Sequence, residues 1–410
     1  MNVLDVLNRA VEDNSIQRWQ EHIILPENGV HFGNSTDIHF LLTVQDIVTL
    51  PSKSYIYLEG KFINSRTRAV PTNSKISNNA FCHLFERATF DLNTKQIDST
   101  RFLGPATTMK NFISSKKSDA ELISISGWNP HNVNNLSRLS ATSNFSACIP
   151  LSSILGFAED YKKVIVNASQ RLMLRRTMDD RNAYEIKDPA QASESCVFEI
   201  THISWRVPFI TLGAKESMAV ARLIQNHAVL QIPFRSWTVF ENAKMKQTTS
   251  DTWQLSTTSK LEKPRFVIFG FQTERKSIET ASASEFDHCN LTDVKVYIDN
   301  QVFPYINLRT DFSTDQFLIL YRMFASFRES YYGEPAEASI SPTFFKQKAP
   351  LIFIDCSRQN DSIKDGGVNF SVEFTTNQNF ADNTCCYALI IHDRIVEYNT
   401  FDRSQVVILN

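Results

Sequence analysis

The chain has 410 residues, of which 42% are hydrophobic and 21% are charged, so it can build a large core and disorder is not indicated. Its formal net charge of -2 provides no overall basic field to attract nucleic acid or an anionic membrane. It contains 30 Phe but 11 Gly, which argues against glycine-rich loops that cradle nucleotides and favours aromatic, pleated surfaces.

The cysteines and the first residues bear on the compartment. Seven cysteines are scattered without a CxxC pair: Cys82, Cys148, Cys196, Cys289, Cys356, Cys385 and Cys386. The start of the chain has no apolar signal core, and no run approaches the roughly 20 apolar residues of a membrane helix. We therefore expect a reducing compartment, free thiols, no secretion and no membrane span.

The first half of the chain reads mainly as strands. Residues 1–18 are predicted to be an arm, with Val3, Leu4, Val6 and Leu7 as a short helix or docking segment. Strands are predicted at 38–44 and 55–63, where apolar residues alternate. Residues 79–90 fit both a helix and a strand. A short helix is predicted at 105–115, a long polar loop at 116–144 and a further strand at 196–205.

The stretch Ala147–Arg176 joins two apolar runs through a charged elbow. The second run alternates with period two, which places Val164, Val166, Leu172 and Leu174 on one face of a half-buried strand. The elbow is Glu159-Asp160-Tyr161-Lys162-Lys163. A catalytic carboxylate needs a partner and a desolvated setting, so adjacent acids followed by adjacent lysines favour a solvated turn between strands.

The pattern starts again near Pro208 and Gly213. A helix is predicted at Thr314–Arg328, where Phe317, Leu320, Phe324 and Phe327 form one stripe after a Ser313/Thr314 cap signal. Further strands are expected at 265–271, 294–298, 351–354, 368–375, 387–391 and 406–409. Many short strands without β-α-β alternation predict an all-β protein with two antiparallel sandwiches or barrels, divided as 1–18, 19–209 and 210–410.

Three more clusters contain residue types that can carry chemistry. Phe286-Asp287-His288-Cys289 could hold a nucleophilic pair, but adjacent residues of a strand point to opposite faces, so a turn acid and a buried thiol are favoured. Cys385-Cys386 with His392 and Asp393 could bind zinc, but paired knuckles are lacking. Arg171, Arg175 and Arg176 could bind phosphate, but Asp179 and Asp180 favour a self-neutralising surface.

A set of segments carries a family likeness. They are, in order, DNSIQRW, DIVTLPSKSYIYLEGKF, NNAFCHLFERATFDLN, GPATTM, IPLSSILGFAEDYKKVI, EKPRFVIFGFQTER, FDHCNLTDVKVYIDNQVFPY, PLIFIDCSRQ and YALIIHDRI. Their order and spacing, from about Asp13 to Glu397, resemble double jelly-roll major capsid proteins of the adintovirus, virophage and Polinton/Maverick type, in the tectivirus-adenovirus lineage.

The resemblance implies two consecutive eight-stranded antiparallel jelly rolls with one or two short helices each. It further implies a homotrimer that forms a pseudo-hexagonal capsomer of an icosahedral double-stranded DNA virus or integrated element. The implied partners are neighbouring capsomers and a single jelly-roll penton protein, without strong direct nucleic acid binding. No catalytic, cofactor-binding or metal residue follows from it. Lys162 and Lys163 are then expected near a subunit contact.

Two other functions stay open at this point. Jelly rolls also host glycan- or protein-binding modules, and Trp128, Trp237 and Trp253, in or near predicted loops, could stack on sugars. A cupin-like metal oxygenase would need two histidines and a carboxylate facing into a barrel, which the sequence does not display convincingly.

Overall fold

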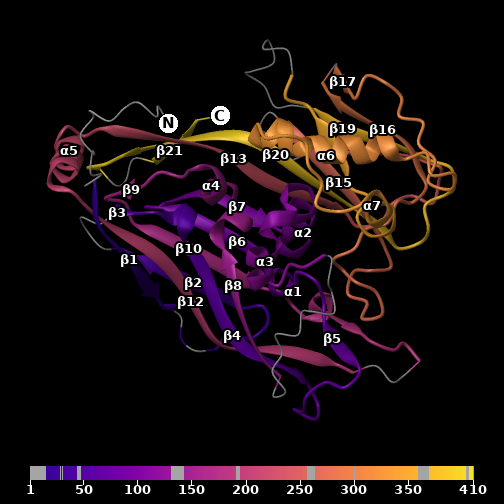
Figure 1. The fold of residues 1–410 in the computed structure, drawn as a ribbon, viewed down its shortest axis with the longest axis horizontal. Helices are drawn as coiled ribbons and strands as arrows, with labels where there is room; N and C mark the ends of the chain where they lie inside the picture. The colour runs from indigo at the N-terminus through magenta and orange to yellow at the C-terminus, as the bar shows by residue number, and fades with distance from the viewer. Residues whose placement is uncertain are drawn as a thin grey trace, which may run out of the picture.

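The computed structural model describes residues 15–27, 29, 31–43, 48–130, 143–190, 194–255, 264–299, 301–358, 369–402 and 406–409. Two systems of antiparallel sheets lie along the long axis of the molecule, formed by earlier and by later residues (Figure 1). Most of the predicted arm 1–18 lies outside the described residues, and the first strand begins at Ile16.

The first system contains a six-stranded and a four-stranded sheet. The six-stranded sheet has the order β8 (Asn144–Pro150), β4 (Tyr55–Asn64), β12 (Cys196–Leu212), β3 (Val48–Thr49) and β9 (Ile165–Val166), with β1 (Ile16–Ile24) paired to β12. The four-stranded sheet has the order β2 (Asp37–Leu42), β10 (Gln170–Arg176), β6 (Phe85–Leu92) and β7 (Lys95–Arg101). A separate pair joins β5 (Ser74–Ile76) to β11 (Tyr184–Ile186). Both larger sheets contribute side chains to one core.

The second system contains a five-stranded and a four-stranded sheet. The five-stranded sheet has the order β13 (Val229–Asn242), β20 (Thr384–Asn399), β15 (Pro264–Thr273) and β18 (Ile352–Asp355), with β21 (Val406–Leu409) paired to β20. The other sheet has the order β14 (Ser250–Gln254), β19 (Phe370–Thr376), β16 (Leu291–Ile298) and β17 (Gln301–Phe303). The facing sheets again share a core, so the chain is an all-β double sandwich as predicted.

Period-two patterning explains where the strands form. In β10, Leu172 and Leu174 are fully buried while Arg171 and Arg175 are exposed, because successive side chains alternate between core and solvent. In β19, Phe370, Val372 and Phe374 are buried, as their alternation predicted. Val368, which the same prediction included, lies outside the described residues.

Seven α-helices occur within the described ranges. They are α1 (Ala80–His83), α2 (Leu103–Ser114), α3 (Ala120–Ile123), α4 (Gly156–Asp160), α5 (Ala214–Gln225), α6 (Leu318–Tyr332) and α7 (Pro342–Lys348). Short 3-10 turns are η1 (Pro51–Lys53), η2 (Lys117–Asp119), η3 (Ser124–Ser126), η5 (Leu151–Ser153) and η6 (Arg181–Ala183). The helices predicted at 105–115 and 314–328 are present, but the latter begins at Leu318, since the Ser313/Thr314 signal lies in a turn.

Other local predictions had mixed outcomes. The stretch 79–90, which fitted both a helix and a strand, contains α1 and the start of β6. Helix α5 was missed because its apolar residues were assigned to a longer apolar segment, although Ala, Lys, Glu, Met, Arg and Leu dominate it and favour helices. The predicted loop 116–144 contains α3 and two 3-10 turns, while residues 131–142 lie outside the described part.

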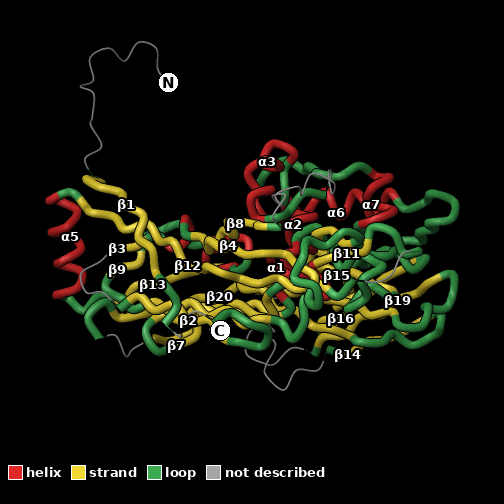
Figure 2. Tube along the Cα trace, turned by 90° about the horizontal axis from the view of Figure 1, so that it is seen from below, coloured by secondary structure: helices red, strands yellow, loops and turns green. Residues whose placement is uncertain are grey.

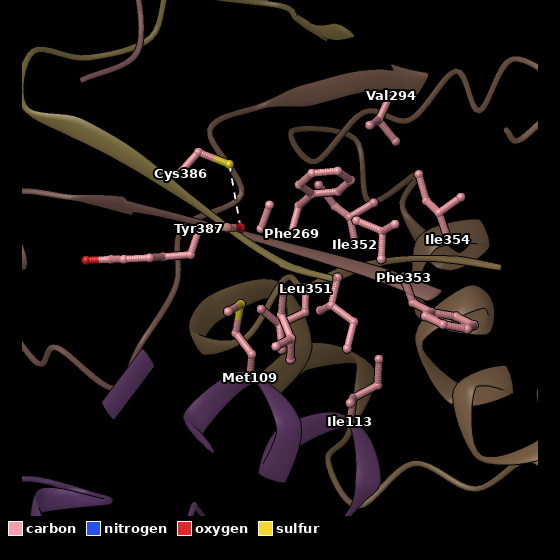
Figure 3. Close-up of a cluster of buried hydrophobic side chains, with 14 of the residues drawn as sticks. Met109, Ile113, Phe269, Val294, Leu351, Ile352, Phe353, Ile354, Cys386 and Tyr387 are labelled. Atoms are coloured by element: carbon pink, nitrogen blue, oxygen red, sulfur yellow. Dashed lines mark hydrogen bonds between the residues drawn. The ribbon is translucent and has the colours of Figure 1, made fainter. Parts of the chain in front are cut away.

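Two elements cross from one core to the other. The long β13–β20 ladder places Ile232 and Val396 in the first core and Trp237 and Ile391 in the second. Helix α2 follows β7 of the first system, yet its Met109 packs in the second core; Figure 3 shows Met109 and Ile113 pointing toward the chain around β18. The two jelly rolls are therefore joined by shared apolar packing.

Candidate functional site

The charged elbow lies where the two cores meet. Glu159 and Asp160 end α4, directly after the buried Gly156–Ala158, and both side chains turn toward the second sheet system. The prediction that they form part of a solvated turn between strands was wrong. Their sequence neighbours Lys162 and Lys163 are exposed, as the prediction required of them.

Glu159 forms a buried ion pair with Lys110 of α2. The Lys110 Nζ lies 2.6 Å from the Glu159 Oε1, and the side chains are only 3% and 14% exposed. Tyr331 donates a hydrogen bond of 2.7 Å to the Glu159 Oε2, and Lys110 Nζ donates one of 2.9 Å to the Tyr332 hydroxyl. This pair ties residues of the first sheet system to helix α6 of the second.

Aromatic rings surround the Lys110 ammonium. The Nζ lies 4.5 to 5.6 Å from four ring centroids, those of Trp237, Phe327, Tyr331 and Tyr332. Burial lowers the pKa of Lys110, and the Glu159 carboxylate opposes that change. Ring faces and the carboxylate together stabilise a cation that the apolar surroundings disfavour.

Asp160 forms the second charged contact, with Arg235 of β13. Arg235 Nε and Nη2 donate to the two carboxylate oxygens at 2.7 and 2.6 Å, and the Arg235 backbone N donates at 2.8 Å. Burial alone would lower the pKa of Arg235, but the hydrogen bonds to Asp160 and the nearby negative charges raise it above its usual value. A Cβ on Gly156 would lie 1.9 Å from the Arg235 carbonyl oxygen, so glycine is required for this approach of α4 to β13.

Further hydrogen bonds extend the same contact. Ser236 of β13 donates to the Asp98 Oδ1 at 2.7 Å, and the Phe157 backbone N donates to the Asp98 Oδ2 at 2.9 Å. Burial raises the pKa of Asp98 despite these hydrogen bonds. At another point of the contact, His83 Nε2 lies 3.0 Å from the Ser284 Oγ, and burial lowers the pKa of His83 to about 4. We call these contacts together the inter-roll contact: the pairs Lys110–Glu159, Asp160–Arg235, Asp98–Ser236 and His83–Ser284.

An open cleft of about 760 Å³ lies beside the Lys110–Glu159 pair. Arg328 of α6 also lines it; its guanidinium donates to the Ser114 carbonyl and to Glu334. Among the residues that line it, Lys110 pairs with Glu159, and Lys116 and Arg328 pair with Glu334. These ion pairs hold α2, α4 and α6 together.

The Phe286–Cys289 cluster is divided between different neighbours. Asp287 accepts two hydrogen bonds from Arg275, at 2.9 and 2.7 Å. The His288 ring stacks on Phe312 at 4.5 Å, while the Cys289 Sγ lies 3.9 Å from the Thr273 hydroxyl. Burial raises the pKa of Cys289 to about 12, so the thiol is protonated at neutral pH and is not an activated nucleophile.

The Cys385–Cys386 cluster lies within one long strand, β20. His392 is six residues from Cys386, about 20 Å along an extended chain, so one ion cannot bind both. Asp393 pairs with Arg265 instead. Within the ranges that the structure describes, no group of three or more His, Cys, Asp and Glu side chains could hold a metal ion.

The arginines of β10 are each paired with an acid. Arg171 contacts Asp91 at 2.7 Å and Arg175 contacts Glu86 at 3.4 Å. The prediction of a self-neutralising surface is wrong for Arg176, because this residue and Asp180 are buried, with side chains 0% and 1% exposed. The Arg176 Nη2 lies 2.9 Å from the Asp180 Oδ1. Their i,i+4 spacing was visible in the sequence, but their burial depended on β6 and β12 packing around them.

The tryptophans do not form a sugar-binding surface. Trp128 and Trp237 are 2% and 0% exposed, so they cannot stack on a ligand in solution. Trp253 of β14 is half-buried against the second core. Trp128 lies in a loop, as predicted, but is buried there, whereas Trp237 lies within β13.

Exposed apolar side chains gather on β1 and on one loop of the second system. On β1 and just after it, Ile16, Trp19, Ile23 and Leu25 are 45% to 59% exposed. After β17, Tyr305 and Ile306 are 88% and 59% exposed. Lys295 Nζ donates to the carbonyls of this loop, at 3.0 Å to Pro304 and 2.6 Å to Ile306. Aromatic and aliphatic groups presented in this way are typical of protein interfaces.

The fold is that of an all-β protein with two systems of packed antiparallel sheets. The chain belongs to the double jelly roll-like domain family, whose model matches residues 74–396. None of the curated proteins compared matches the chain. In the part of the chain described, no helix is long and apolar enough to cross a membrane.

Three solved structures with the same fold come from viruses or a virophage. The PBCV-1 protein VP54, fitted into a reconstruction of the virophage Sputnik, is similar with a TM-score of 0.59, 9% identity, and 98% and 99% of the two chains covered. The mavirus major capsid protein gives a TM-score of 0.57, 11% identity, and 100% of this chain and 92% of that one. The Faustovirus major capsid protein gives a TM-score of 0.56 at 10% identity, and the alignment covers 95% of this chain and 92% of that one.

Proposed function

We propose that the protein is a major capsid subunit of an icosahedral double-stranded DNA virus or a related integrated element. The observation that supports this most is coverage: the likeness extends over the whole chain and over nearly all of the mavirus major capsid protein. The buried inter-roll contact is consistent with this role, because a shell tile needs its two jelly rolls in a constant orientation. The role is structural, without catalysis, cofactor or metal.

We further propose that three copies form a pseudo-hexagonal capsomer from six jelly rolls. A closed ring of identical chains uses two different surfaces on each copy. The exposed apolar residues of β1 and the Tyr305–Ile306 loop belong to different sheet systems of the chain, so they can provide two such surfaces. The division into an arm at 1–18 and jelly rolls at 19–209 and 210–410 remains our proposal.

The decisive experiment measures the oligomer directly. Size-exclusion chromatography with light scattering should give a mass near three times 46.9 kDa, and negative-stain images should show hexagonal outlines. A monomer that persists at micromolar concentration, without hexagonal particles, would contradict the capsomer.

The partners follow from the same proposal. Neighbouring capsomers and a single jelly-roll penton protein would complete a shell, so the protein would reside in the virion after synthesis in the host cytoplasm or nucleus. The net charge of -2 gives the protein no overall attraction to the DNA phosphates, so direct binding to DNA should be weak. A gel-shift titration should therefore show no specific complex at physiological salt.

A further inference from the structure

Helix α5 lies at one end of the molecule, next to β1, and is poorly covered (Figures 1 and 2). It has 12 residues, and none of them is buried. Helices of this length are marginal in water without packing partners. Val220 and Ile224 pack on Val48, Val166 and Ile210, but Met218 and Leu223 remain 58% and 41% exposed. The helix therefore has room for a further packing partner.

A groove of about 420 Å³ runs between α5 and the sheet. The helix lines it with Ser217, Val220, Ala221 and Ile224, which share one face because they are three, four and seven residues apart. The sheet lines it with residues of β1 and β12, including His22, whose ring stacks on Phe209 at 3.9 Å. We call this the α5 groove.

One segment of the chain enters the structure beside this groove. The backbone N of Gly213, immediately before α5, donates a 2.8 Å hydrogen bond to the carbonyl of Ser15. The residues before Ser15 contain Val3, Leu4, Val6 and Leu7, which are apolar. Fourteen extended residues reach about 45 Å, and α5 is about 18 Å long, so the segment can follow the groove.

Charge favours the same occupant. Residues 1–14 carry Asp5, Glu12 and Asp13 against one arginine, Arg9. The α5 helix carries Lys215 and Arg222 against Glu216. A net acidic segment therefore meets a net basic helix. We propose that the α5 groove binds residues 1–14 of this chain, with apolar side chains of the segment against Val220, Ala221 and Ile224.

The first test uses disulfide trapping in the full chain. Leu4→Cys is combined with Ala221→Cys, which lies in the groove, or with Ala219→Cys, which lies about 200° away around the helix. None of the seven native cysteines is exposed, so background cross-linking should be low. After mild oxidation, peptide mapping should recover the 4–221 disulfide at least tenfold above the 4–219 disulfide.

The second test reads docking without new cysteines. Trypsin can cleave after Arg9, and docking should slow that cleavage. Ala221→Asp should speed it about tenfold or more, because an unpaired carboxylate in an apolar groove opposes docking. Ala219→Asp has the same cost to the helix and should leave the cleavage rate at the wild-type value.

Equal trapping at positions 219 and 221, or equal cleavage rates in all three proteins, would overturn the proposal. Far-UV circular dichroism confirms that each variant is folded before it is compared. The proposal does not depend on the capsid role, since a monomer could also bind its own residues 1–14.

Discussion

The Lys110–Glu159 pair allows a quantitative test of the inter-roll contact. Glu159→Gln keeps the shape of the side chain and leaves the Lys110 ammonium, 3% exposed, without its carboxylate. Removing one partner of a buried pair typically costs about 3–5 kcal/mol. The four aromatic rings and the Tyr332 hydroxyl remain, so we expect the lower end, about 3 kcal/mol of unfolding free energy.

Two matched variants isolate the cause. Lys110→Met added to Glu159→Gln removes both charges, so the double variant should be at least as stable as Glu159→Gln alone. Asp393→Asn breaks the pair with Arg265, whose side chains are 43% and 61% exposed. Exposed pairs contribute about 0–1 kcal/mol, so this control should change stability little.

The assay is urea unfolding followed by tryptophan fluorescence and far-UV circular dichroism. Trp237 lies beside Lys110, and it contributes with four other tryptophans to the fluorescence change on unfolding. If Glu159→Gln destabilises no more than Asp393→Asn, the buried pair does not stabilise the contact and our reasoning about it fails.

Three further predictions concern other parts of the molecule. Gly156→Ala should destabilise the fold by about 1–3 kcal/mol or more in thermal unfolding, because the added Cβ would lie 1.9 Å from the Arg235 carbonyl oxygen. Gly33→Ala is the control, since its Cβ would meet no atom within 4 Å and stability should not change. Equal effects of the two substitutions would contradict the close approach of α4 to β13. Burial lowers the pKa of His83 from 6.5 to about 4, so below pH 6.5 the unfolded chain binds a proton that the folded protein does not. The contribution of His83 to the unfolding free energy should be complete above pH 6.5 and fall by about 3 kcal/mol toward pH 4. The same fall in a His83→Gln variant would refute this. Reversing the exposed Lys162 and Lys163 to Glu should weaken the proposed trimer in light scattering, and intact assembly would argue against a subunit contact there.

Local patterns determined most of the secondary structure. Alternation in β19 and β10 identified their buried faces, because a strand's period of two depends only on backbone geometry. The stripe of Phe317, Phe324 and Phe327 likewise indicated α6. The order of the segments along the chain also predicted the double jelly-roll family, and the fold and the family match confirm that prediction.

Tertiary packing alone decided which charges are buried. Glu159 and Asp160 read as a solvated turn, because no local pattern shows that Lys110, 49 residues earlier, and Arg235, 75 residues later, lie beside them. Ion pairs at such separations depend on how α2, α4 and β13 pack. Met109 of α2 entered the second core for the same reason. The sequence by itself determined the strands and the family, whereas the contact between the rolls arose only from long-range packing.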